Sequence, residues 1–325
     1  MVLKNDGIKI VMNRNLELLL GIMVAYIEKN PDMIKNFDFI EIPDISYVKD
    51  ICKVNKINKC SLTLDFLLNI SNYRTIVYFA CFLDDNYDID FDRFNYSYFS
   101  SSDYSKDYLV SVALDLKKYA KSIKWNEFFD SNYEYYKKLY SFIKIPDKFD
   151  ITDINRFYDD YSYSYTCFPS VFMNVGFSFI DKKNNFYYFR GFTFNEKIKV
   201  FNYYGSYFTE CLFYEFSVPI VRKLVERYYS SINDIDTLYN AVISNGLPVS
   251  YGDKKGMLCE YVSRTNSFIL NAKYYKNLEV EDSVYFLGFD RIENMISFSK
   301  RRIKKFSNYE EFFKYDMVNY INNMR

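Results

Sequence analysis

Two aromatic runs in the second half of the chain constrain its fold more than any other stretch. VFMNVGFSFI (171–180) and NFYYFRGFTF (185–194) are rich in aromatic and β-branched residues, and only the polar residues 181–184 separate them. Such runs on either side of a short polar segment are typical of a β-hairpin. Because helical patterns precede and follow them, the sequence predicts an α+β fold, mainly helical, with a small sheet.

The rest of the chain has mainly helical patterns. A short strand, IKIVM (8–12), leads into a helix from about Asn15, along which apolar residues recur on one stripe. A second short strand is expected at SVYFLGF (283–289). Further helices are expected near 46–57, 62–70, 74–83, 105–122, 131–143, 205–217, 219–230, 233–244, 257–276, 291–304 and 308–323.

No repeat and no Gly- or Pro-rich linker interrupts these patterns, so we predict one domain over residues 1–325. Its N-terminal half, about 1–150, should be helical, and the predicted hairpin falls in the second part, about 151–325.

Charge and composition exclude several function classes. The 42 basic residues equal the 42 acidic ones, so no basic excess points to a nucleic-acid partner. The chain has no His, which rules out a Ser-His-Asp triad, a Cys-His dyad and a His-ligated zinc ion. Its six Cys residues form no CxxC pair, and we expect buried free thiols.

The longest apolar stretch, LELLLGIMVAYI (16–27), is too short to span a bilayer and contains Glu17. The N-terminal residues carry charge where a signal peptide would have an apolar core. We therefore expect a soluble, cytoplasmic protein without a membrane partner.

One glutamate stands out in the apolar run ECLFYEFSVP (210–219). Cys211, Tyr214, Glu215 and Val218 fall at positions i, i+3, i+4 and i+7, so they share one face of the expected helix. Tyr-Glu-Phe-Ser-Val occupies the five positions of a His-Glu-x-x-His motif, whose His residues bind zinc while the Glu activates water. In such enzymes a later helix often supplies a third ligand.

The chain resembles a bacterial family of uncharacterised proteins with a gluzincin-type metallopeptidase-like domain. The resemblance runs along nearly the whole chain, in the family's order. It is carried by IKIVMNRNLELLLGI (8–22), WNEFFDSNYEYYKKLY (125–140), the hairpin, FYEFSVPIV (213–221), CEYVSRT (259–265) and VYFLGF (284–289). It implies a zincin-like core over about 151–325, with a sheet or hairpin packed on the active-site helix.

By this resemblance, Glu215 stands at the general-base position and Glu260 at the position of the third zinc ligand. Tyr214 and Val218 stand where the two His residues should be, and Arg264 matches a basic residue one turn after the third ligand. Val has no donor atom and a Tyr phenol is an uncommon zinc ligand, so we expect no metal and no cofactor. Pro219 should end or kink the helix.

Other readings of these residues remain open. Cys211, Glu215 and Glu260 could converge with Cys259 on a different metal site, or the two Cys could be small buried hydrophobes. Glu215 and Glu260 could form the carboxylate pair of a hydrolase that works without zinc. Alternatively, Glu215 could be a buried acid paired with a Tyr hydroxyl or with Arg264, and Glu260 could form only an i,i+4 ion pair with Arg264.

The leading hypothesis is a catalytically inactive metallopeptidase-like protein that keeps a cleft for a peptide or protein. The alternatives are a non-zinc hydrolase using Glu215 and Glu260, or an aromatic-rich binding module. Two weaker signals are the basic run KRRIKK (300–305), expected to be a solvated helix face, and Asp159 with Asp160. That acidic pair could bind a cation or simply lie in an exposed loop.

Overall fold

The computed structural model divides the chain into two compact units. Unit 1 comprises Met1–Ile143 and Ser164–Tyr203, and unit 2 comprises Lys144–Tyr163 and Tyr204–Arg325. Each unit takes two separate stretches, so the division does not follow the expected change near residue 150. The described residues are 2–5, 7–43, 45–70, 72–99, 104–141, 145–191, 193–195, 200–202, 205–233, 235–244, 253–275, 278, 289 and 291–324.

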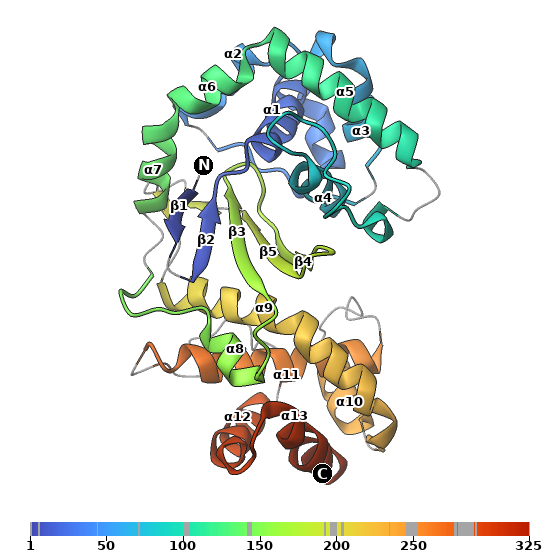
Figure 1. Cartoon of the computed structure of the whole chain (residues 1–325), viewed down its shortest axis with the longest axis vertical. Helices are drawn as coiled ribbons and strands as arrows, with labels where there is room; N and C mark the ends of the chain where they lie inside the picture. The colour runs from blue at the N-terminus through green and yellow to red at the C-terminus, as the bar shows by residue number, and fades with distance from the viewer. Residues whose placement is uncertain are drawn as a thin grey trace. The chain divides into compact units, whose positions relative to one another are not determined.

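Unit 1 contains a five-stranded mixed sheet with strand order β1-β2-β3-β5-β4 (Figure 1). β2 pairs in parallel with β3 and β3 with β5, whereas β1–β2 and β4–β5 are antiparallel. A small sheet within a mainly helical chain confirms the predicted α+β class. The strands are β1 (Val2–Asn5), β2 (Ile8–Val11), β3 (Ser164–Ser170), β4 (Gly176–Ile180) and β5 (Asn185–Gly191), with a separate pair β6 (Thr193–Asn195) and β7 (Val200–Asn202).

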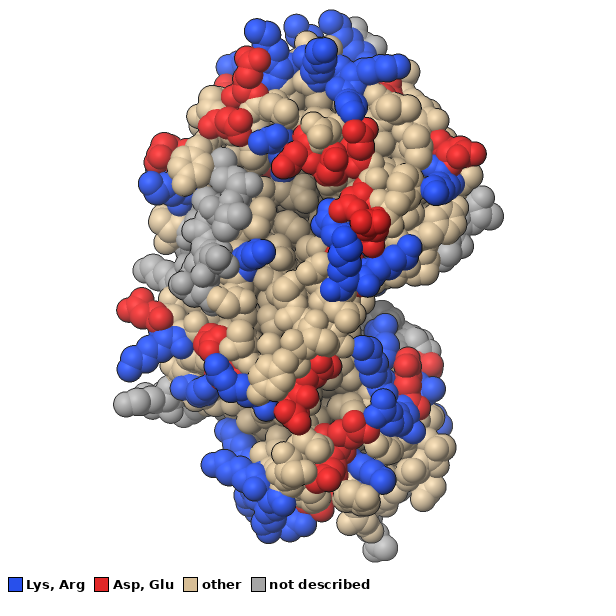
Figure 2. Space-filling view, viewed as in Figure 1, with Lys and Arg blue, Asp and Glu red and all other residues tan. Residues whose placement is uncertain are grey.

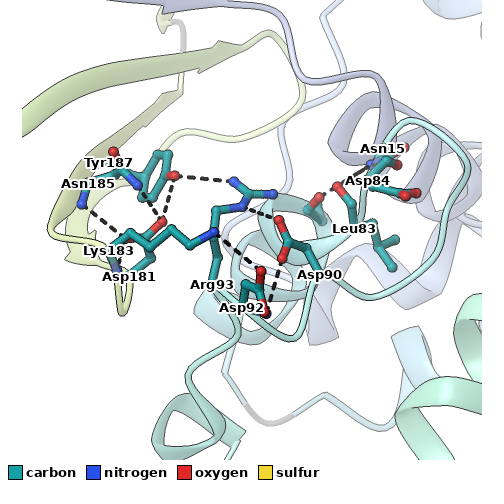
Figure 3. Close-up of polar contacts among 11 residues, drawn as sticks. Asn15, Leu83, Asp84, Asp90, Asp92, Arg93, Asp181, Lys183, Asn185 and Tyr187 are labelled. Atoms are coloured by element: carbon teal, nitrogen blue, oxygen red, sulfur yellow. Dashed lines mark hydrogen bonds and ion pairs between the residues drawn. The ribbon is translucent and has the colours of Figure 1, made fainter.

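The predicted hairpin is present as β4 and β5, and Asp181 closes its turn (Figure 3). One oxygen of the Asp181 carboxylate accepts the backbone N–H groups of Lys183 at 2.8 Å and Asn185 at 3.0 Å. The other oxygen accepts the hydroxyl of Tyr187 at 2.9 Å. Asn184 has a positive φ of 59°, a conformation that Asn adopts more readily than most residues. The polar segment between the aromatic runs therefore encodes the turn directly.

The first strand of the hairpin begins later than predicted, because residues 171–175 are not part of the ladder. Their backbone passes so close to Gly191 that a Cβ there would lie 1.7 Å from the carbonyl oxygen of Met173. The Gly191 N–H donates to the carbonyl of Val175 at 2.8 Å. Residues 171–175 thus form a crossing from β3 to β4 whose first three residues are buried.

The helices of unit 1 include α1, whose residues 15–25 are all buried. Asn13 caps it by accepting the N–H groups of Asn15 and Leu16, each at 3.0 Å. Because this part of the helix is buried on all sides, its apolar residues are not confined to the predicted single stripe. In Figure 1, α1 to α6 gather at one end of the strands. The helices are α1 (Arg14–Lys29), α2 (Ser46–Val54), α3 (Ser61–Leu68), α4 (Arg74–Phe82), α5 (Lys106–Ser122), α6 (Trp125–Ser131) and α7 (Tyr133–Ser141).

Unit 2 is helical in its described residues, and α11 lies along α9 (Figure 1). Most residues of α11 are buried, so this helix lies at the centre of the unit. The helices are α8 (Asp153–Tyr158), α9 (Gly205–Tyr228), α10 (Asp236–Ser244), α11 (Lys254–Asn271), α12 (Ile292–Arg302) and a C-terminal run of α13 (Tyr309–Glu311), a π-helical segment (Phe312–Met317) and α14 (Val318–Asn322).

Of the two outcomes predicted at Pro219, an end or a kink, the end is wrong, since α9 continues through it to Tyr228. Pro219 cannot donate to the carbonyl of Glu215, and Pro inside a helix costs about 3 kcal/mol. Residues on both sides of Pro219, such as Phe216 and Val221, are buried in the core. Packing over the whole length of α9 outweighs this local cost.

Of the strand expected at 283–289, all but Phe289 lies outside the described residues. Among the helices described, none is both long and apolar enough to cross a bilayer.

Candidate functional site

The two helices that carry the predicted site residues, α9 and α11, run antiparallel in unit 2. Near the start of α9, the hydroxyl of Thr209 donates to the side-chain oxygen of Asn271 at 2.7 Å, and the Asn271 amide donates to the Ser206 carbonyl at 2.9 Å. Further along α9, Tyr214 reaches Glu260 near the start of α11. The two helices therefore lie side by side.

Glu260 is held by the two residues that flank it in the predicted site. Its Oε2 atom accepts the hydroxyl of Tyr214 at 2.5 Å and the guanidinium of Arg264 at 3.0 Å. The side chains of Arg264 and Glu260 are only 8% and 17% exposed. The ion pair is thus largely shielded from water, where charge-assisted hydrogen bonds are strong.

Two aromatic rings flank the guanidinium of Arg264. Its central carbon lies 5.1 Å from the ring centroid of Tyr214 and 4.6 Å from that of Phe289. Phe289 in turn packs edge-on against Tyr261, with centroids 4.8 Å apart. Cation–π contacts and the Glu260 carboxylate together compensate for burying this charge.

The phenol of Tyr214 is fixed in its protonated form. Burial raises the pKa of Tyr214 well above 10, and the negative charge of Glu260 raises it further. Glu215 adds to the same effect, so its carboxylate also lies within electrostatic reach of this phenol. A protonated phenol that donates to Glu260 is not a metal ligand.

The remaining predicted residues differ in exposure. Glu215 and Val218 are half-buried, whereas Cys211 is fully buried. Burial also raises the pKa of Cys259 to about 11, so this thiol stays protonated. Both Cys residues therefore fit the role of small buried hydrophobes. Arg264 and Tyr214 both hydrogen-bond Glu260.

These residues do not fit a zinc site. Val218 offers no donor atom, and the Tyr214 hydroxyl and the Arg264 guanidinium both bond one of the two Glu260 carboxylate oxygens. Within the part of the chain that the structure describes, no group of three or more Cys, Asp or Glu side chains could hold a metal ion. The alternative thiolate–carboxylate site has no support in this geometry.

Glu17 on α1 is a buried carboxyl that the sequence motifs did not mark as a functional residue. It is 1% exposed, and its oxygens accept the hydroxyl of Ser170 at 3.1 Å and that of Tyr47 at 3.4 Å. Tyr47 also hydrogen-bonds Tyr136. Burial raises the pKa of Glu17 from 4.5 to about 8, more than these hydroxyls lower it. The sequence signal was the same as for Glu215, an acid inside an apolar helical run.

Comparisons of this chain with protein-family models, with curated proteins and with solved structures return no match.

Proposed function

We propose that this protein is a catalytically inactive relative of the gluzincin-type metallopeptidases and acts by binding a peptide or protein. The ion pair between Glu260 and Arg264 carries the proposal. Glu260 stands at the third ligand position, and the Arg264 guanidinium supplies the positive charge that a zinc ion would bring. Tyr214, at the first His position, donates to the same carboxylate oxygen.

Metal analysis of the purified protein tests the first part of the proposal. We expect far less than one zinc ion per chain after exposure to zinc and removal of the excess, because a lone carboxylate does not hold the ion against water. Stoichiometric zinc would overturn the proposal.

Restoring the His-Glu-x-x-His motif tests whether the protein is related to zinc metallopeptidases. The variant Tyr214→His/Val218→His should bind one zinc ion, since the two imidazoles would lie on one helix face opposite Glu260. Adding Arg264→Leu should tighten binding at least about tenfold, because it removes the competing cation. Isothermal titration calorimetry measures both affinities.

The matched control places the same His spacing on α5 in unit 1, as Leu114→His/Lys118→His at two exposed positions. This pair has the i,i+4 geometry but no counterpart of Glu260. If it binds zinc as tightly as the restored motif, Glu260 contributes nothing and the gluzincin-like geometry is refuted.

Peptide binding has a test of its own. Peptides selected from a displayed random library on the purified protein should lose affinity when Glu215 is replaced by Gln, since a peptide in the ancestral cleft would lie beside that carboxylate. Glu127→Gln, on α6 in the other unit, is the control and should leave affinity unchanged. Selected peptides that bind both variants equally would place any peptide site elsewhere.

The non-zinc hydrolase is the weaker candidate. It needs Glu260 to act on a substrate, yet one oxygen of this carboxylate already accepts from Tyr214 and Arg264. A general acid or base must reach the proton that it transfers, and an internal ion pair opposes this. Loss of a measured hydrolytic activity in Glu215→Gln, with the fold intact, would reverse this ranking.

A further inference from the structure

Unit 2 has a cavity of about 330 Å³ that none of the residues of the predicted metal site lines. Its walls come from the end of α8, the end of α9 and the first turns of the C-terminal helical run. This volume falls within the range of small-ligand sites. The cavity is therefore large enough for one side chain or a small organic molecule.

Tyrosines form one part of its lining. Tyr158 is buried, its hydroxyl accepts the side-chain amide of Asn266 at 2.9 Å, and its ring meets Tyr309 edge-on at 4.9 Å. Tyr315, by contrast, is 57% exposed. The cavity thus combines a rigid aromatic wall with a second ring that is open to solvent.

Carboxylates form the other part, and one of them is already neutralised. Glu310 accepts the hydroxyl of Tyr228 at 2.6 Å and pairs with Arg227. These contacts, the Tyr228 hydroxyl first, hold the pKa of Glu310 below its usual value, so it is ionised. Its charge is matched within the chain.

Asp159 and Glu311 add two negative charges to the lining, to which Lys314 contributes one positive charge. Glu311 accepts the hydroxyl of Ser307 at 2.6 Å. In the described parts of the chain, no ion pair involves Asp159 or Glu311. Figure 2 shows acidic side chains gathered over the region of unit 2 where Figure 1 places α8 and α13.

The chain itself shows how a cation can lie against this lining. Lys314 also borders the cavity, and its ammonium lies 4.7 Å from the ring centroid of Tyr315. Tyr158 presents the same type of ring to the cavity, and Asp159 adds a carboxylate beside it. Aromatic faces combined with carboxylates are the usual recognition elements for organic cations.

We propose that this cavity binds an alkylammonium group, carried either by a small diamine or by a lysine side chain of a peptide. The aromatic wall packs against the alkyl stem, and Asp159 and Glu311 neutralise the ammonium. The inference does not rest on the proposed pseudoenzyme function, because its residues lie outside the Tyr214–Glu260–Arg264 cluster. The proposal also gives a role to Asp159, the first residue of the acidic pair at 159–160.

Calorimetric titration of the full chain with matched ligands tests the proposal. The probes are 1,5-diaminopentane against 1,5-pentanediol, and a short lysine peptide against the same peptide acetylated at the ε-amine. Each ammonium form should bind at least about tenfold more tightly than its neutral partner. Preference for the diamine or the peptide identifies the source of the group, and equal binding of charged and neutral forms overturns the proposal.

Variants locate the binding. Asp159→Asn keeps shape and tolerates the positive φ of 53° at this position, so it should fold and yet bind the preferred ligand about tenfold more weakly. Glu311→Gln should act in the same direction, and Tyr315→Leu should weaken binding a few-fold while Tyr315→Phe does not. Unchanged affinity in both Asp159→Asn and Glu311→Gln would overturn the assignment.

Discussion

Replacing Glu17 with Gln should stabilise unit 1 by about 3 kcal/mol at pH 7 and by less than about 1 kcal/mol at pH 5. The carboxyl is buried among Ser170, Tyr47 and Tyr136, and no cation pairs with it among the described residues. Gln can accept from Ser170 and donate to Tyr47, so the local hydrogen bonds survive. The amide carries no proton whose loss could destabilise the fold.

The direction of this pH-dependent change in stability follows from the pKa of Glu17, which is 4.5 in an ordinary environment and about 8 in the folded protein. Between these values the folded state holds a proton that the unfolded state has released. Stability from this group is therefore complete below pH 4.5 and falls as pH rises toward 8. Each pH unit in this window costs about 1.4 kcal/mol, a dependence that Gln abolishes.

Trp125, the single tryptophan, is fully buried in unit 1, so its fluorescence during urea unfolding reports on this unit. The measurement is repeated from pH 5 to pH 8.5. The control is Glu127→Gln on α6, whose side chain is 75% exposed. A Glu17→Gln protein that is less stable than the original at pH 7, or a control with the same pH-dependent gain, would refute the argument.

Replacing Arg264 with Met should destabilise unit 2 by about 3 kcal/mol. Met keeps an unbranched apolar stem, but it removes the guanidinium that lies against Tyr214 and Phe289 and leaves Glu260 shielded from water without this positive partner. Hydrogen exchange followed by mass spectrometry in peptides from α9 and α11 measures the loss within this unit.

The double variant Glu260→Gln/Arg264→Met should recover most of that stability, because removing both charges leaves no unpaired ion. Arg227→Met is the matched control, since its guanidinium is 59% exposed and pairs with Glu310 at the surface. Surface pairs contribute less than about 1 kcal/mol. Equal losses in Arg264→Met and Arg227→Met, or no recovery in the double variant, would contradict a buried ion pair at Glu260.

Local chemistry made part of this structure predictable. The hairpin follows from two aromatic runs around Asp181, and most helices follow from apolar periodicity. The meeting of Glu260 with Arg264 follows from i,i+4 spacing on one helix. Each of these features depends on residues that are close in sequence.

Features set by distant residues could not be read in the same way. Whether α9 ends at Pro219 depends on burial of its flanks, which only tertiary packing decides. The hydrogen bonds that Glu17 accepts come from Tyr47 and Ser170, and no local sequence pattern links these residues to it. For the same reason, the sequence could suggest that Arg264 pairs with Glu260 but not that Tyr214 shares the same oxygen.

The pairing of β2 with β3 has a consequence for synthesis on the ribosome. β2 is made near the start of the chain, but its parallel neighbour begins only at Ser164, after Lys144–Tyr163 has been made for the other unit. Until β3 emerges, one edge of β2 is open, and an exposed strand edge invites pairing with other chains. We therefore expect an incomplete sheet with an open β2 edge while Lys144–Tyr163 is being made, and this edge is a site for aggregation during that interval.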